Sequence, residues 1–220
     1  MYYKIINEQW NHNGYQYIPG LNVLQEEFND NPNDSCCKGG FYFTTIDNIF
    51  KFLNYGCYLV EVTLPTSDSD FKMVSDPCGN AWDQRSQHNL PLRGQGDKFR
   101  SNKIILGKKY DLADITTFQM MIDLGANIDT NDDALKWASS NGHLEVVKFL
   151  VEKGANVHAD DNYALGWASE NGHLDVVKFL VEKGADVNAD NNCALRWASK
   201  NGHLDMVNYI KYLIKKDTNA

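Results

Sequence analysis

The chain contains the stretch ALKWASSNGHLEVVKFLVEKGANVHADDNY (residues 134–163), which recurs at once as ALGWASENGHLDVVKFLVEKGADVNADNNC (residues 164–193). The two copies differ at seven of thirty positions, and a third, ALRWASKNGHLDMVNYIKYLIKK, starts at Ala194. Upstream, DITTFQMMIDLGANIDTNDD matches the second half of the unit, with Gly125 in the place of Gly154. Self-similarity at a fixed period predicts a stacked repeat architecture, here opened by a degenerate copy.

Each unit predicts a short helix, a tight turn and a longer helix. Residues 134–140 carry one apolar stripe, the Asn-Gly-His of residues 141–143 interrupts it, and residues 144–153 continue as an amphipathic helix. Gly154 then ends the second helix, because glycine readily takes the left-handed conformation of a helix cap. Neither helix buries its apolar face alone, so the units must stack on one another.

The phrase N-G-H-L-[ED]-V-V-K-F-L-V-E-K-G-A-[ND]-V-[HN]-A closely resembles the ankyrin repeat. The resemblance spans residues 104–220 and implies an all-α solenoid of ankyrin type with short, 30-residue repeats. It divides into a degenerate repeat at 104–133, repeats at 134–163 and 164–193, and a C-terminal cap at 194–220. The usual period is about 33 residues, and the family's Thr-Pro-Leu-His start is replaced by Tyr163-Ala164-Leu165-Gly166. We therefore expect short fingers instead of β-hairpins between the units.

The last copy differs where the family has its Gly-Ala turn. Its apolar residues, from Met206 to Ile214, continue the helical pattern up to Lys215 and Lys216. A terminal repeat needs a polar outer face, and Asn208 here replaces the lysine of the earlier copies. This pattern predicts a long capping helix.

Residues 1–103 contain no repeat and follow a strand-like pattern. Aromatic and β-branched runs bounded by glycine or proline predict strands, and a helical spacing of apolar residues predicts a helix at 46–55. We expect strands at 2–6, 41–45, 58–64, 71–74 and 103–106. The region is therefore expected to be a small α+β module.

Two further phrases precede the repeats: Gly-Gly-Phe-Tyr-Phe-Thr at Gly39–Thr44 and Lys-Phe-Arg-Ser-Asn-Lys at Lys98–Lys103. An N-terminal block with such phrases ahead of an array is similar to the ankyrin-repeat proteins of giant amoebal DNA viruses of the mimivirus type. The resemblance implies a viral origin and a host protein as partner. The basic cluster of Lys98, Arg100 and Lys103 could hold an anion, but we expect it to seal the junction between module and array.

Composition excludes several function classes. The net charge is −8 with an isoelectric point near 5.2, and the basic residues form no stripe, which argues against nucleic acid as the ligand. The sequence has neither an apolar run of roughly 18 residues nor a signal-like N-terminus, so we expect no membrane association and no secretion. Five cysteines at no disulfide or metal spacing indicate a reducing compartment, the host cytoplasm or the virion.

Two periodic rows suggest ligands but are better explained by structure. His143, His173 and His203 recur at the repeat spacing, which is on the order of 10 Å and too wide for a shared metal ion. We expect them to be turn residues with a structural hydrogen bond. The row of Trp137, Trp167 and Trp197 matches the core-facing position of the ankyrin first helix. No metal and no cofactor are expected.

The ankyrin resemblance implies a concave binding face built from the fingers and the first helices. Two rows on that face vary between otherwise near-identical copies, which favours a role in partner binding, although neutral drift at exposed positions explains the variation equally well. The candidate partner-binding residues are Lys136, Gly166 and Arg196 in one row, and Ser140, Glu170 and Lys200 in the other. Acidic finger residues such as Asp160 and Asp190 could face a basic partner.

The sequence favours a non-enzymatic protein–protein interaction module, with two alternatives. The order of His12, Tyr42 and Glu61 faintly resembles ADP-ribosyl-transferase-like folds, in which a histidine and a tyrosine hold nicotinamide and a glutamate stabilises the oxocarbenium charge. The N-terminal module would then be an enzyme, or its relic, acting on partners that the repeats recruit. The other alternative is a structural or virion component without a specific ligand.

Overall fold

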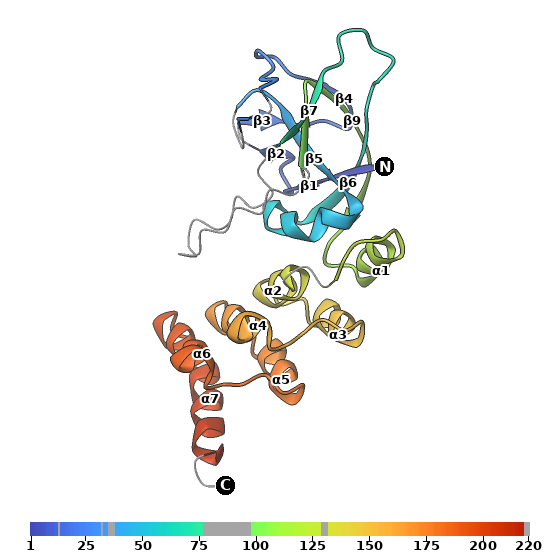
Figure 1. The fold of residues 1–220 in the computed structure, drawn as a ribbon. Helices are drawn as coiled ribbons and strands as arrows, with labels where there is room; N and C mark the ends of the chain where they lie inside the picture. Colours follow the sequence, from blue (N-terminus) through green and yellow to red (C-terminus); the bar gives the residue numbers. More distant parts are fainter. Residues whose placement is uncertain (13, 32, 35–37, 77–97, 129–131, 218–220) are drawn as a thin grey trace. The chain divides into compact units, whose positions relative to one another are not determined.

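A computed structural model describes residues 1–12, 14–31, 33–34, 38–76, 98–128 and 132–217 (Figure 1). The chain forms two compact units, Met1–Asn127 and Ile128–Ala220. The N-terminal unit is rich in strands and the C-terminal unit is helical (Figure 1). This confirms the expected α+β module followed by an ankyrin-type solenoid.

The N-terminal unit is built on a seven-stranded sheet in which each described neighbour pair is antiparallel. The strand order is β4-β9-β6-β1-β5-β8-β7. The strands are β1 (Tyr2–Ile6), β4 (Gly20–Val23), β5 (Phe41–Thr45), β6 (Tyr58–Thr63), β7 (Met73–Asp76), β8 (Lys98–Ser101) and β9 (Lys103–Asp111). A separate pair joins β2 (Asn11–His12) to β3 (Tyr15–Gln16). The strand predictions at 2–6 and 41–45 are confirmed to the residue, and the helix at 46–55 is the 3₁₀ helix η1 (Ile46–Tyr55).

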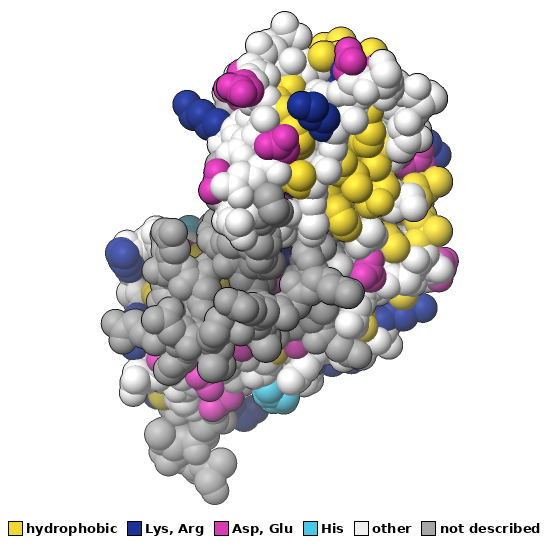
Figure 2. All heavy atoms as spheres, turned by 45° about the horizontal axis from the view of Figure 1, so that its top comes forward, with side chains coloured by type: hydrophobic (Ala, Val, Ile, Leu, Met, Phe, Trp, Pro, Cys, Tyr) yellow, Lys and Arg dark blue, Asp and Glu magenta, His cyan; other side chains and the backbone are white. Residues whose placement is uncertain are grey.

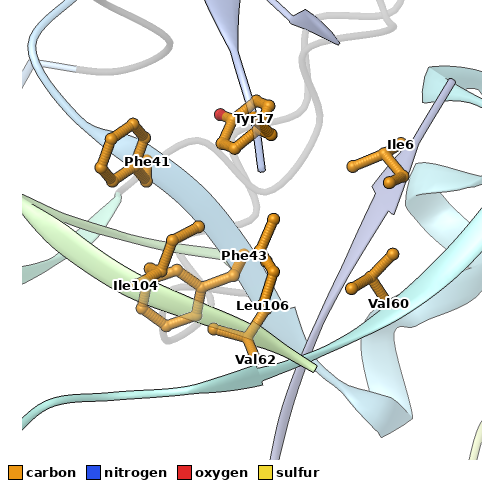
Figure 3. Close-up of a cluster of buried hydrophobic side chains, with 8 residues drawn as sticks. All are labelled: Ile6, Tyr17, Phe41, Phe43, Val60, Val62, Ile104 and Leu106. Carbon is orange, nitrogen blue, oxygen red and sulfur yellow. The ribbon is translucent and has the colours of Figure 1, made fainter. Parts of the chain in front are cut away.

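One face of the sheet carries a hydrophobic core cluster of this unit (Figure 3). Alternate residues of β5 and β6 point to the same side, as the two-residue period of a strand requires. The cluster consists of Ile6, Tyr17, Phe41, Phe43, Val60, Val62, Ile104 and Leu106, all buried. Because Ile104 and Leu106 complete this core, β9 is an integral part of the sheet.

The expected boundary between residues 103 and 104 therefore falls inside β9. This strand pairs with β6 on one side and β4 on the other. The helix α1 (Ile115–Asp123), expected in the opening repeat, also lies in the N-terminal unit. Its Phe118 stacks on Phe50 of η1 with ring centroids 5.8 Å apart. The match to the second half of the repeat includes a helix followed by a left-handed glycine, Gly125 at φ +102°.

The surface of the N-terminal unit includes hydrophobic side chains, which gather on the face shown in Figure 2. Strand β4 lies at an edge of the sheet, and its Leu21 and Val23 are exposed, as is Ile18 just before it. The edge strand therefore offers apolar side chains to solvent.

Over its described residues, 132–217, the C-terminal unit forms three helix pairs. Their helices are α2 (Asp133–Ser140), α3 (Leu144–Glu152), α4 (Ala159–Glu170), α5 (Leu174–Glu182), α6 (Ala189–Lys200) and α7 (Leu204–Asp217). The first helices α2, α4 and α6 pack side by side, and α3 packs on α5 (Figure 1). The long helix α7 confirms the predicted helical continuation, and Gly154 takes the predicted left-handed conformation at φ +102°.

The fingers between units are short, as expected from the 30-residue period. Asp160, Asp161 and Asn162 are all left-handed, with φ of 48°, 56° and 62°, and residues 190–192 repeat this conformation. Aspartate and asparagine tolerate left-handed φ better than other non-glycine residues. The backbone of the connector thus accounts for the Asp-Asn composition of the fingers. Finger contacts also join units, since the Asp132 carboxylate accepts a hydrogen bond from the backbone N–H of Asn156 at 2.8 Å.

The Asn-Gly-His turn joins the two helices of a unit and links neighbouring units. The His173 ring bonds the Ser140 carbonyl through Nε2 at 3.0 Å, and His203 bonds the Glu170 carbonyl at 2.8 Å. This confirms the predicted structural hydrogen bond for these two histidines. A Cβ on Gly142 would lie 2.4 Å from the His173 ring, so glycine is required both for its positive φ and for the close approach.

Candidate functional site

The six predicted partner-binding residues occupy equivalent places on the first helices. Lys136, Gly166 and Arg196 each follow the buried or half-buried leucine of α2, α4 and α6, and Ser140, Glu170 and Lys200 end those helices. Their environments differ strongly, because each helix has different neighbours.

In the first row, only Arg196 extends an exposed charge. Lys136 bonds the Asp160 carboxylate of the next unit and lies 3.8 Å from Asp133, so it links α2 to α4. The Arg196 side chain is half exposed, donates to the Asn191 carbonyl at 3.2 Å and lies 3.5 Å from Asp190. Gly166 is buried, and a Cβ there would lie 3.0 Å from Cζ3 of Trp197.

In the second row, the carbonyls of Ser140 and Glu170 link neighbouring units, and the charged ends of Glu170 and Lys200 are partly or fully exposed. The Ser140 and Glu170 carbonyls accept the histidine bonds described above, and Asn171 donates to the Ser140 hydroxyl at 3.2 Å. Glu170 is half-buried and Lys200 is exposed. The row therefore contributes one acidic and one basic group at the ends of α4 and α6.

The tryptophan row is only partly core. Trp137 is buried, whereas Trp167 and Trp197 are half-buried and contact each other with ring centroids 5.5 Å apart. Tyr163 is exposed, and its ring centroid lies 6.3 Å from that of Trp197. Trp167 and Trp197 thus lie only partly in the core, where fully core positions were expected, and Gly166 leaves room for the Trp197 ring to pack on α4. Tyr163 was not among the candidate binding residues predicted from the sequence. The signal for it was that the equivalent position of the next copy is Cys193, so this position also varies between copies.

We call this aromatic and charged group the first-helix surface. It consists of Tyr163, Trp167, Glu170, Arg196, Trp197 and Lys200. Aromatic residues and arginine are the side chains that contribute most to protein–protein binding energy. No cluster of three or more potential metal-ligating side chains occurs within the described ranges.

A second candidate site is a cavity of about 230 Å³ in the N-terminal unit. It lies where β1 and β5 diverge: the two strands pair only at Tyr2–Thr45 and Tyr3–Thr44, whereas β1 pairs with β6 along its whole length. The cavity is lined by Tyr3, Lys4, Ile5, His12, Tyr42, Phe43, Thr44, Phe52, Tyr55 and Lys98.

Lys4 is the most unusual residue of this cavity. Its side chain is buried, donates to the Tyr42 carbonyl at 2.8 Å and lies 4.7 Å above the Tyr17 ring. Burial, and secondarily the charge of Lys98, lower its pKa to about 7. Within the part of the chain that the structure describes, no carboxylate lies within 4.0 Å of Lys4 Nζ.

Lys4 makes the stability of this unit depend on pH. Its pKa is 10.5 in the unfolded chain and about 7 in the fold, so the unfolded chain binds more protons between these values and stability rises with pH there. Below pH 7, the buried charge of Lys4 lowers the free energy of unfolding by about 5 kcal/mol. The hydrogen bond to Tyr42, worth about 1–3 kcal/mol, offsets part of it.

We therefore expect Lys4→Met to raise the unfolding free energy at pH 6 by about 2 kcal/mol and to flatten the pH dependence. His12, Tyr17 and Lys98 face the ammonium and stay in place in the variant. Urea denaturation at pH 6 and pH 9 measures both effects. A variant less stable than the natural chain at pH 6 would contradict this account of Lys4.

The structure brings two of the three transferase candidates together. His12 and Tyr42 both line the cavity, while Glu61 does not. Instead, the Glu61 carboxylate accepts a hydrogen bond from the Tyr110 hydroxyl. Burial, Lys4 and Lys98 lower the pKa of His12 to about 4, so its imidazole is neutral near pH 7.

The cluster of Lys98, Arg100 and Lys103 has its described partners inside the N-terminal unit. Lys98 and Arg100 lie 3.6 and 3.5 Å from the buried Asp76, and Lys103 lies 2.7 Å from Asp68. The expectation that this cluster seals the junction with the array is therefore wrong. The alternation of β8 turns Arg100 into its own unit, where it holds a loop.

The comparisons place this architecture in a known class. The protein-family model described as "Ankyrin repeats (3 copies)" matches residues 158–220 of the sequence. A second family model, described as "Ankyrin repeat", matches residues 130–162. The chain belongs to the ankyrin repeat family, and its repeats are a protein–protein interaction module.

Three similar proteins come from Acanthamoeba polyphaga mimivirus. An ankyrin repeat protein of this virus is 41% identical over 158 residues, which is 72% of this chain and 70% of the relative. An uncharacterised mimivirus protein is 42% identical over 152 residues, 69% of this chain and 97% of the relative. A third, again an ankyrin repeat protein, is 42% identical over 161 residues, 73% of this chain and 43% of the relative. The resemblance to mimivirus ankyrin-repeat proteins is thereby confirmed.

Two further observations concern membrane-spanning helices and the cysteines. In the described ranges, no helix has both the length and the apolar content needed to cross a membrane. Cys57 and Cys193 are free cysteines, while Cys36, Cys37 and Cys78 lie outside the described residues.

Proposed function

We propose that the array binds a host protein through the first-helix surface, without catalysing a reaction, inside the host cell or the virion. The half-buried pair of Trp167 and Trp197 beside Gly166 carries this proposal. Tryptophans that keep part of their rings exposed on a packed helix layer can bury that area against a partner at little entropic cost.

The charges around the tryptophan pair suit a polar partner surface. Arg196 and Lys200 extend from α6 and Glu170 from α4. Charges at the rim of an interface steer encounter and reject wrong partners more than they add affinity. The variation of these positions between copies therefore supports specificity for one partner.

Rigidity supports the same function. The histidine bonds, the finger bonds and the Lys136–Asp160 ion pair join successive units on both sides of the first-helix surface. A surface that is already ordered loses little conformational entropy on binding, so modest contacts leave a net affinity.

The test is affinity capture from an amoebal host lysate with the full chain and a charge-swapped variant, Glu170→Lys/Arg196→Glu/Lys200→Glu. We leave out Lys136 because its ion pair holds two units together. We expect the swap to reduce capture of the main partner about tenfold, equal to about 1.4 kcal/mol. Quantitative mass spectrometry measures the ratio.

The matched control changes the same charges on the second helices: Glu182→Lys/Lys178→Glu/Lys211→Glu. These exposed residues of α5 and α7 lie outside the first-helix surface. Capture should be retained by the control. Equal capture by both variants would overturn the proposal and would favour the alternative of a structural component without a specific ligand.

The transferase alternative has little support from the cavity. An oxocarbenium-like transition state is positively charged, and the cavity lining contains Lys4 and Lys98 but, among the described lining residues, no carboxylate. Two cations that line the cavity oppose the positive charge that develops in such a transition state. We therefore do not assign an enzymatic activity to the N-terminal unit.

A further inference from the structure

We propose that the cavity between β1 and β5 binds a small aromatic anion, a flat ring carrying a carboxylate or a phosphate, with Lys4 holding the anionic group and the surrounding aromatic side chains holding the ring. This inference concerns the N-terminal unit and does not depend on partner binding by the array.

The divergence of β1 and β5 creates the site. Beyond the Tyr3–Thr44 pair the two strands share no described ladder hydrogen bond, so the Tyr42 carbonyl accepts from the Lys4 side chain instead. An ammonium has three protons, and this bond uses one of them. Lys4 thus lies at the cavity wall with donor capacity for a ligand.

The electrostatics of the cavity favour an anion. Lys4 and Lys98 both line it, with only 4% and 6% of their surface exposed, and Lys98 depresses the pKa of both Lys4 and His12. Asp76, whose carboxylate lies 3.6 Å from Lys98, also lies 3.5 Å from Arg100. A bound anion would lower the cost of burying Lys4, because charges interact strongly where water is excluded.

The walls favour a flat ring. Phe52 and Tyr55 come from η1 and Tyr42 from β5, and His12 tilts against the Tyr55 ring with centroids 5.0 Å apart. His12 is neutral near pH 7 and therefore acts as an aromatic wall and not as a third cation. Stacked and edge contacts with such rings suit an aromatic ligand.

The size of the cavity agrees with this ligand. A cavity of roughly 150 Å³ accepts a benzene ring, and the present one measures about 230 Å³. The remaining space is sufficient for one anionic substituent. The described lining has two ammonium groups and no carboxylate, which disfavours a metal ion or a cationic ligand.

The experiment is calorimetric titration of the full chain at pH 6.5 with four probes. Benzoate and phenyl phosphate carry both ring and anion, benzyl alcohol carries the ring alone, and inorganic phosphate carries the anion alone. We expect at least one aromatic anion to bind about tenfold more tightly than either single-feature probe. The stronger of the two identifies carboxylate or phosphate as the natural group.

Variants connect binding to the cavity. Lys4→Met should weaken binding of the aromatic anion about tenfold or more, the size of one charge-assisted contact. Lys109→Met is the matched control, because Lys109 lies over the Tyr58 ring at 3.8 Å and does not line the cavity. If Lys4→Met fails to fold, Tyr55→Ala removes one aromatic wall instead and should weaken binding as well. Absence of binding by both aromatic anions, or equal affinity in these variants, would overturn the proposal.

Discussion

Arg100→Met is expected to lower the unfolding free energy of the N-terminal unit by about 3–5 kcal/mol. Arg100 is fully buried and lies 3.5 Å from the equally buried Asp76. Its guanidinium also donates to the carbonyls of Asn29, Asn31 and Asp34. The substitution takes the guanidinium away from the buried Asp76 carboxylate and from three carbonyls, and methionine cannot replace those bonds.

Lys103→Met is the control for this change. Lys103 also lies beside a carboxylate, 2.7 Å from Asp68, but that carboxylate is partly exposed. Exposed ion pairs contribute about 1 kcal/mol or less. Urea denaturation followed by circular dichroism should separate the two variants clearly. If Arg100→Met lost no more stability than Lys103→Met, the loop would not depend on this buried arginine.

Gly142→Ala is expected to destabilise the array by about 2–4 kcal/mol. A left-handed φ costs alanine about 1 kcal/mol, and Gly142 is at φ +71°. The added Cβ would also lie 2.4 Å from Nδ1 of His173, and relieving that overlap costs about 1–3 kcal/mol more. Displacing His173 also breaks its bond to the Ser140 carbonyl.

Gly202→Ala separates the cost of the left-handed φ from the cost of the overlap with a histidine ring. Gly202 has nearly the same φ, +76°, but nothing lies within 4 Å of its Cβ position because no described unit follows. This variant should lose only about 1 kcal/mol. Thermal denaturation of both variants measures the difference. Equal losses would show that the histidine contact between units contributes little to stability.

Local patterns predicted the parts of the fold that depend on local interactions. The helix pairs, the left-handed glycine caps, the extended α7 and the strands β1 and β5 all follow from periodicity and turn residues within a few positions. The histidine bonds were also predictable, since a polar turn residue repeated at each unit boundary suggests a structural partner. The residues proposed for partner binding remain a prediction.

The features that the sequence did not predict depend on contacts between residues that are far apart in the chain. Nothing local assigns β9 to the sheet, because its pairing with β4 joins segments some eighty residues apart. The buried position of Arg100 depends in the same way on residues 29–34 and 76. The cavity arises where two strands diverge, and strand pairing is not encoded locally. The contact of Trp197 with α4 depends on Gly166, because a Cβ there would lie 3.0 Å from the Trp197 ring.

The central claim is that the first-helix surface contacts the partner, and site-directed photocrosslinking tests it most directly. Benzoylphenylalanine is placed in the full chain at Tyr163, on this surface, or at Tyr212, which is more exposed but lies on α7. Both are tyrosines, so the change in shape is similar. We predict a crosslink to the captured partner from position 163 and none from position 212. A crosslink from position 212 alone would contradict the account.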